Sequence, residues 1–177
     1  MTLRMSILPL IAAALLATAT NNSGKTTTAT APVTPVAKKV PGTPTVTNIM
    51  AGQSMVAGTV TVVDDQDLGT LTVTYQLNNG WYLKETHLYA GTIPGIPVGN
   101  SGNPRPGQFP YKKTTFAAGS QTHTVVIPLA GLPTDVITLA AHCVVTGTSN
   151  QTGWGQGPQI NDGGSWAMRF DHVLEVR

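Results

Sequence analysis

The stretch TLTVTYQLNNGWYLKETHLYA, residues 70–90, decides the fold class of this chain. Its first part, residues 70–77, alternates between apolar and polar side chains, which is the pattern of a strand with one buried face. Asn79-Gly80 follows, and this dipeptide predicts a tight hairpin turn into a second strand. The positions expected to face the core are Leu71, Val73, Tyr75 and Leu77.

The same period of two recurs along most of the chain. In the last such stretch, Trp166, Met168 and Phe170 are expected to share one face. About seven strands of this kind predict an all-β fold, an antiparallel β-sandwich of the immunoglobulin-like or jelly-roll type. The expected strands are residues 45–50, 58–63, 70–77, 81–90, 122–129, 136–145 and 166–176.

The connections predict where a site would lie. If each connection reverses the chain, alternate loops fall at the same end of the sandwich, and the long loops share one end. The loop 91–120 has no hydrophobic period, and such a long connection is typical of a functional or disordered segment. One end is expected to hold residues 64–69, 91–120 and 147–165, and the other end residues 78–80 and 130–134.

Four residues of the long loops are candidates for ligand binding: Arg105, Phe109, Tyr111 and Trp154. Aromatic side chains among Gly and Asn can form a shallow surface that stacks on sugars. The alternative is that Phe109 and Trp154 fold back as plugs over the open end of the sandwich. Both interpretations explain why large apolar side chains occur in loops.

A group of acidic residues suggests a calcium site. Asp64, Asp65 and Asp67 follow one strand, and Asp162 lies in a loop expected at the same end. Together they could supply oxygen ligands for Ca²⁺, which takes six to eight. Their spacing does not match the EF-hand loop, and aspartates are also common in turns because they tolerate turn geometry.

A second polar group lies within the expected strands. His142 could be the neighbour of Glu85 and His87, and two histidines with a carboxylate suit a metal ion. The alternative is a hydrogen-bonded polar framework that fixes strand register, with neutral histidines. Cys143 lies on the opposite face, where it alternates with apolar residues such as Ala141 and Val145, and this favours a small buried apolar residue over a nucleophile. The face of residues 81–90 with the polar group is expected to carry Leu83, Glu85, His87 and Tyr89.

The N-terminus has the features of an export signal. Residues 7–19 form an apolar run, short for a membrane span, that ends in the cleavage motif Ala17-Thr18-Ala19. We therefore expect residues 1–19 to be a signal peptide, residues 20–44 a flexible Thr/Pro-rich arm and residues 45–177 the folded domain. The chain is predicted to be secreted, extracellular or at the cell surface, with no membrane contact after cleavage.

Composition and the N-terminal arm indicate which kinds of partner to expect. The formal net charge is +2, too small to indicate nucleic-acid binding. The arm suggests self-association through residues 20–50, because an extended segment can add a strand to the sheet edge of a neighbour. The apolar side chains for this would be Val33, Val36, Val40 and Val46.

Six segments, in order, resemble a module of secreted bacterial and archaeal surface proteins. They are GWYLKETHLYAG, GNPRPGQFPY, HTVVIPL, LAAHCVV, GWGQG and GSWAMRF, within residues 80–170. In that module five of these segments commonly read ETHL-x-VG, PGxFPY, AAHAVV, ETAWG-x-G and NWAxYF. This chain departs at Gln151, where the module usually has Glu, and at Arg169, where an aromatic is common. The resemblance implies a secreted surface module whose framework includes Glu85, His87, His142, Trp154 and Trp166.

These observations favour a cell-surface or extracellular-matrix module with an adhesive, glycan-binding or structural role. The first alternative is a filament subunit that assembles by strand addition through its N-terminal arm. The second is a carbohydrate-active hydrolase, which needs two carboxylates at a defined separation. Glu85 is the sole carboxylate among aromatic residues, and no catalytic motif such as G-x-S-x-G or H-E-x-x-H occurs, so we do not expect an enzyme.

Overall fold

The computed structural model of the protein describes residues 42–175. The predicted signal peptide and most of the predicted arm lie outside the described residues. In the described part, no helix is both long enough and apolar enough to cross a membrane. The elements are β1 (Thr45–Ala51), β2 (Met55–Asp65), β3 (Thr70–Leu77), β4 (Tyr82–Gly91), η1 (Ile93–Gly95), η2 (Pro106–Gln108), β5 (Tyr111–Lys113), β6 (Thr122–Pro128), β7 (Val136–Thr146), β8 (Asn150–Gly155) and β9 (Phe170–Val173).

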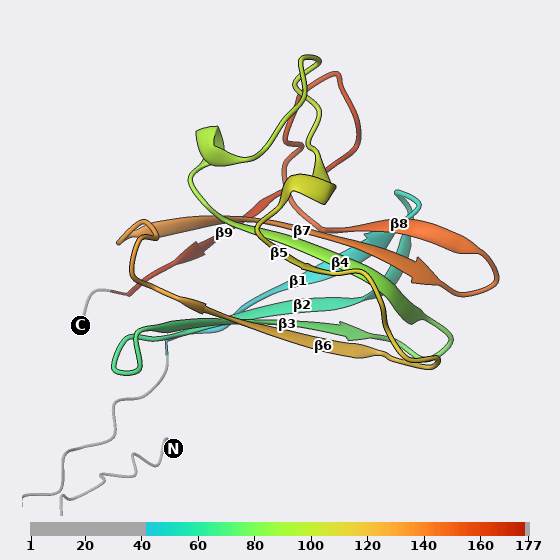
Figure 1. Cartoon of the computed structure of the whole chain (residues 1–177), viewed down its shortest axis with the longest axis horizontal. Coiled ribbons are helices and arrows are strands. Elements are labelled where there is room, and N and C mark those ends of the chain that lie inside the picture. The colour runs from blue at the N-terminus through green and yellow to red at the C-terminus, as the bar shows by residue number, and fades with distance from the viewer. Residues whose placement is uncertain (1–41, 176–177) are drawn as a thin grey trace, which may run out of the picture. The chain divides into compact units, whose positions relative to one another are not determined.

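The strands form a nearly closed antiparallel barrel, so the predicted sandwich was wrong (Figure 1). Eight strands follow one hydrogen-bonded path, β5-β4-β7-β8-β1-β2-β3-β6, and β9 pairs with β7 beside that path. The ends of the path approach each other. The Leu83 N–H of β4 donates to the Ser120 carbonyl just before β6, and Thr86 shares a 2.9 Å hydrogen bond with His123 of β6. A sandwich would leave two separate sheets, whereas one ladder joins the strands here.

Strand β8, which the alternation did not predict, makes the difference between the two architectures. It pairs with β7 on one side and with β1 on the other, and thereby joins the strands that a sandwich would separate. Its sequence NQTGWG lacks apolar–polar alternation because it needs small residues against the core. A Cβ on Gly153 would lie 2.7 Å from Cys143 Sγ. A Cβ on Gly155 would lie 2.6 Å from the Phe170 ring.

The core-facing alternation predicted for β3 is confirmed, because its four inward positions are buried. Tyr75 lies across the barrel interior, and its hydroxyl lies 3.4 Å from the His87 carbonyl. Burial raises the pKa of Tyr75 well above its ordinary value and that of Cys143 to about 12, so both stay protonated. The main core includes Val60, Val62, Leu71, Val73, Tyr75, Leu77, Ile137, Leu139, Ala141, Cys143 and Val145.

The turn at Asn79-Gly80 exists, but the hairpin predicted from it was wrong. The Trp81 N–H donates to the Asn78 carbonyl, and Gly80 has a φ of +87°, which glycine adopts at little cost. The strands that this turn connects do not pair with each other. Strand β3 lies between β2 and β6, and β4 lies between β5 and β7. The turn therefore passes the chain from one half of the barrel to the other.

A bulge in β4 changes which side chains share a face. The pairing with β7 shifts between Leu83 and Glu85, so Lys84 is the extra residue. Leu83 belongs to the main core, while His87 and Tyr89 lie on the outer face of the barrel. The prediction that Leu83 shares a face with them was wrong, because one inserted residue reverses the alternation of a strand.

The long loops do not gather at one end of the barrel. The β2–β3 turn lies beside the β6–β7 loop, where the Leu129 N–H donates to the Gly69 carbonyl. The β7–β8 turn lies at the other end, where Gly147 is close to Trp81. The predicted grouping of the three long loops was therefore wrong. Strands β5 and β8 add reversals inside two of those segments, so a count of reversals that omits them predicts the wrong end.

A second apolar cluster lies outside the barrel, beneath the two long loops that rise from it in Figure 1. The loops are joined where the Asn161 side-chain N–H donates to the Ser101 carbonyl. Trp166 and Met168 pack against this cluster, whereas Phe170 belongs to the main core, so the predicted shared face of these three was wrong. We call it the outer cluster, and its buried members are Tyr89, Ile96, Phe109, Ala140, Trp154 and Ala167.

Candidate functional site

The four residues predicted to bind a ligand have different surroundings. Phe109 and Trp154 meet in the outer cluster, edge to face with ring centroids 6.3 Å apart, and are 1% and 4% exposed. Tyr111 is half-buried against the main core, and Arg105 is exposed beside Gly99. The two covered rings pack outside the barrel, beneath the long loops, and not as plugs over an open sandwich end. A ligand role for the four residues stays a prediction.

Glu85, His87 and His142 meet on the outer face of the barrel. The histidines are directly opposite each other on β4 and β7, and their Nδ1 atoms lie 3.1 Å apart, so one of these nitrogens carries the shared hydrogen. Glu85 Oε2 lies 3.7 Å from His87 Nε2, which favours a hydrogen on that nitrogen. The His142 ring also packs on Trp154, with centroids 4.8 Å apart.

Burial keeps both of these histidines neutral near neutral pH. Burial, together with the smaller effect of the neighbouring His87, lowers the pKa of His142 from 6.5 to about 3. Burial also lowers the pKa of His87, against the opposing effect of Glu85. A neutral pair suits the polar framework and would equally suit a metal ligand. Among the described residues, however, no group of three or more His, Cys, Asp or Glu side chains could hold a metal ion.

Asp64, the first of the predicted calcium ligands, instead takes part in a buried hydrogen bond between strands. It is buried with His172, whose Nε2 lies 3.2 Å from Asp64 Oδ1. The Nδ1 atom of the same ring shares a 2.9 Å hydrogen bond with the Thr45 hydroxyl. Because these residues come from β2, β9 and β1, the network ties three strands together at one end of the barrel.

The other three predicted calcium ligands lie elsewhere. Asp65 caps the β2–β3 turn, because its Oδ1 accepts the main-chain N–H groups of Asp67 and Leu68 at 3.0 Å. Asp162 lies in the loop between β8 and β9 that covers the outer cluster. The structure therefore does not bring the four predicted ligands together into one site.

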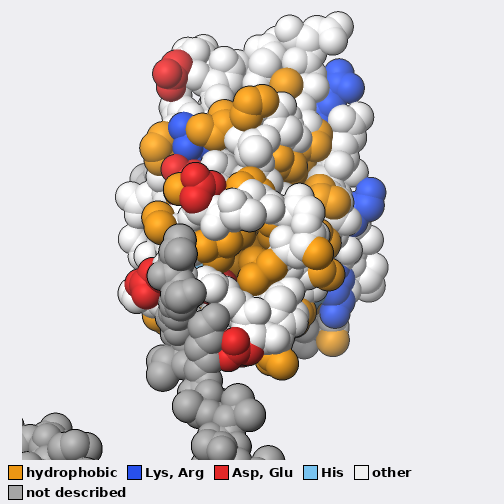
Figure 2. Space-filling view, turned by 90° about the vertical axis from the view of Figure 1, so that its left-hand side faces the viewer, with side chains coloured by type: hydrophobic (Ala, Val, Ile, Leu, Met, Phe, Trp, Pro, Cys, Tyr) orange, Lys and Arg blue, Asp and Glu red, His pale blue; other side chains and the backbone are white. Residues whose placement is uncertain are grey.

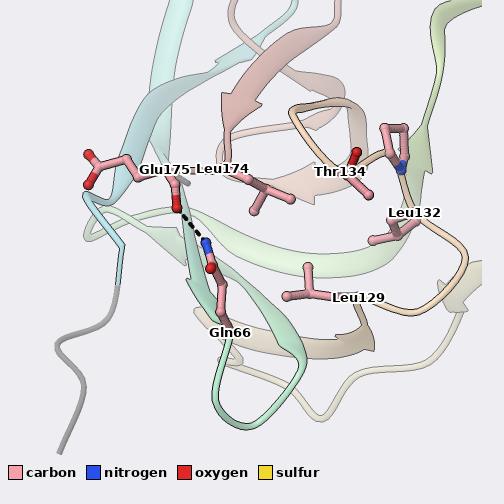
Figure 3. Close-up of a pocket in the computed structure, with 7 residues that line it drawn as sticks. Gln66, Leu129, Leu132, Thr134, Leu174 and Glu175 are labelled. Carbon is pink, nitrogen blue, oxygen red and sulfur yellow. Dashed lines mark hydrogen bonds between the residues drawn. The ribbon is translucent and has the colours of Figure 1, made fainter. Parts of the chain in front are cut away.

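An apolar hollow of about 270 Å³ lies at the barrel end where the β2–β3 turn, the β6–β7 loop and the chain after β9 meet (Figure 3). We call this hollow the mouth. Figure 2 shows apolar side chains gathered at the centre of this end of the molecule, with acidic side chains around them. The mouth is lined by Gln66, Leu129, Leu132, Pro133, Thr134, Leu174 and Glu175.

Hydrogen bonds hold the three chain segments around the mouth. The Gln66 side-chain N–H donates to the Glu175 carbonyl at 2.7 Å, as drawn in Figure 3. The Leu174 N–H donates to the Asp135 carbonyl at 2.7 Å. Within the β6–β7 loop, the Leu132 N–H donates back to the Leu129 carbonyl, which closes a turn. The mouth is therefore formed before any partner arrives.

The rim of the mouth is acidic. Glu175 lines it, Asp67 directly follows the lining residue Gln66, and Asp135 directly follows Thr134. All three acids are exposed, and none of the seven lining residues is Lys or Arg. Negative charge around an apolar hollow favours a partner that carries positive charge next to apolar side chains.

The sequence reasoning missed the mouth because it looked for aromatic and charged side chains in long loops. The segment PLAGLPTD, residues 128–135, is short, and the predicted grouping of loops puts residues 130–134 at the opposite end from the β2–β3 turn. A signal was present nonetheless. Leu129 and Leu132 lie three apart in a Pro/Gly turn, where no strand period can bury both of them.

Comparisons with known proteins do not assign a function. No family model, no curated protein and no solved structure matches this chain. The function is therefore argued from the mouth and from the surroundings of the buried polar groups.

Proposed function

We propose that this chain is an exported cell-surface or matrix module that binds a segment of another protein at its mouth. The observation that carries the proposal is the preformed apolar hollow with an acidic rim. Apolar contact inside the hollow would supply affinity, and the acids would select a basic neighbour. The role is adhesive or structural, and no bond is made or broken.

The size and walls of the mouth support a peptide side chain as its occupant. Pockets for small molecules usually enclose about 300–1,000 Å³ and surround most of the ligand. The mouth encloses about 270 Å³ at the molecular surface, which suits one or two apolar side chains. Its lining residues include no aromatic ring on which a sugar would stack.

The surroundings of the histidines support binding over catalysis. His87 and His142 face each other beneath the long loops, and His172 is enclosed with Asp64 inside the barrel end. A general acid or base must reach a substrate atom within hydrogen-bond distance. These side chains instead use their polar atoms on one another, which stabilises the fold.

A binding experiment with designed peptides tests the proposal. Three nonapeptides share a Val-Pro centre and are flanked by Lys, by neutral residues or by Glu. Each peptide is titrated against the exported chain, which is held at nanomolar concentration, and binding is followed by fluorescence anisotropy. We expect the Lys-flanked peptide to bind most tightly. Leu132→Arg, which places a cation in the mouth, should raise its dissociation constant about tenfold or more.

Met55→Arg is the matched control. Met55 is also an exposed apolar residue, but it lies at the start of β2, beside the β1–β2 turn at the other end of the barrel. This variant should bind the peptides as the parent does. Equal loss in both variants, or peptide binding that Leu132→Arg leaves unchanged, would contradict a binding site at the mouth.

A further inference from the structure

We propose that the partner segment is Pro32–Lys39 of a second copy of this chain, and that two copies exchange these segments to form a closed dimer. The inference rests on the proposed function of the mouth and names its occupant. The segment reads PVTPVAKK, so it offers two valines, two prolines and two adjacent lysines. These are the apolar and basic groups that the hollow and its rim would take.

Charge complementarity points to this segment. Residues 1–63 contain no Asp or Glu, and Lys38 and Lys39 are the adjacent pair of cations within them. The acids flanking the mouth are Asp67, Asp135 and Glu175. With Val36 in the hollow, the two lysines that follow within three residues would lie against this rim. An opposite arrangement of charges would be repelled.

The described chain begins at the same end of the barrel as the mouth. The Gly42 N–H donates to the Asp64 carbonyl, and the Thr43 hydroxyl donates to a Glu175 carboxylate oxygen at 2.6 Å. Glu175 itself lines the mouth. The six peptide units between Val36 and Gly42 can span about 20 Å when extended, enough to reach a facing copy.

The sequence before Gly42 favours a neighbour over the chain's own mouth. Pro41 and Pro44 fix φ near about −65°, and a residue that precedes proline is biased toward extended backbone. Val40 and Thr43 precede these prolines. A stretch with this bias favours contact with a facing copy over a turn back into the mouth of the same chain.

The start of the described chain and the mouth lie at the same end of the barrel, and this decides the form of the assembly. Because the described chain begins beside the mouth, two copies facing each other can each fill the mouth of the other. Such a reciprocal contact closes with two-fold symmetry. A filament would need the arm and the mouth at opposite ends, so this exchange yields a dimer in place of the filament expected from strand addition.

A charge exchange between the two surfaces tests the inference. The full chain is expressed with export, and the recovered protein is studied by sedimentation velocity over a range of concentrations. We expect a concentration-dependent dimer. Lys38→Glu with Lys39→Glu, and separately Asp67→Lys with Asp135→Lys, should each raise the dimer dissociation constant about tenfold or more. An equimolar mixture of the two variants should dimerise as the parent does, because each mouth then meets an arm of opposite charge.

The outcomes separate this inference from the proposed function. Unchanged thermal melting of each variant, together with dimers in the mixture, shows that the variants fold. A parent chain that stays monomeric, a dimer that survives both charge reversals, or growth beyond the dimer would overturn the exchange. The peptide titration against Leu132→Arg would still decide whether the mouth binds at all.

Discussion

The outer cluster and the mouth are both apolar and both lie outside the strand ladder, yet one is closed and the other open. Phe109 and Trp154 of the outer cluster are almost completely covered. Leu132 and Leu174 of the mouth are only partly buried against the main core. The difference lies in the connections, because two joined loops cover the outer cluster, whereas the mouth opens at the molecular surface (Figure 2).

This comparison shows which loop residues point to a binding role. Large aromatic side chains in a long loop can bury their own area, and that burial alone explains their presence. Leucines in a short, hydrogen-bonded loop that stay half-exposed gain less from folding, so their exposure needs another reason. We therefore expect changes in the outer cluster to alter stability, and changes in the mouth to alter binding.

Trp154→Ala should give the largest effect. It removes a ring that packs on both Phe109 and His142, and truncating a buried aromatic costs about 3–5 kcal/mol of unfolding free energy. Urea denaturation measures this loss, and peptide affinity at the mouth should stay within about twofold of the parent. A variant of parental stability that lost ligand affinity would show instead that Trp154 belongs to an open binding surface.

Acid should give the second-largest loss of stability, through His142 beside the outer cluster. The folded pKa of His142 is about 3, against 6.5 for an ordinary histidine, so between these values the unfolded chain binds more protons than the folded one. The contribution of His142 to the free energy of unfolding is then fully present above pH 6.5, and it falls by about 1.4 kcal/mol for each pH unit below that value. Urea unfolding between neutral pH and about pH 4 measures the slope, and His142→Gln should flatten it. An unchanged slope in that variant would show that other groups cause the acid sensitivity.

Gly153→Ala should give an intermediate effect by disturbing the strand beneath the outer cluster. The added Cβ would lie 2.7 Å from Cys143 Sγ, and such overpacking costs about 1–3 kcal/mol. Adding Cys143→Ala should recover part of the loss, which a double-mutant cycle detects. Gly107→Ala is the control, because nothing lies within 4 Å of its Cβ position. Equal effects of the two glycine substitutions would contradict close packing at β8.

Leu132→Ser should have the smallest effect on stability. The side chain is only partly buried, so we expect a loss of about 1 kcal/mol or less in thermal or urea denaturation. The affinity for a Lys-flanked apolar peptide should nevertheless fall. A stability loss as large as that of Trp154→Ala would place Leu132 in the core and remove the contrast between the two regions.

The sequence predicts the buried face of a single strand better than it predicts how the strands are joined. The alternation in β3 identifies its buried face, because period two is a local property of a strand. It does not reveal β8, whose glycines fit against Cys143 and Phe170, and without β8 a barrel cannot be told from a sandwich. The bulge at Lys84 likewise leaves no local signal, yet it decides that Leu83 faces inward.

The candidate sites likewise depend on contacts between strands and loops that a single sequence does not specify. The contact between His87 and His142 depends on the register of β4 and β7, which a single sequence does not specify. The mouth depends on three segments far apart in the chain, joined by contacts such as that of Gln66 with the Glu175 carbonyl. Residue types alone therefore drew attention to aromatic residues that the fold covers.

Amide hydrogen exchange with a synthetic PVTPVAKK peptide tests the central claim most directly. The exchange of the Lys38→Glu, Lys39→Glu chain, whose own arms should not fill the mouth, is compared with and without a saturating amount of this peptide. We expect slower exchange in residues 129–134 and at Gln66, with no change in the loops over the outer cluster. Protection of residues 100–110 or 154–166 instead, or no protection at all, would contradict the assignment of the mouth as the binding site.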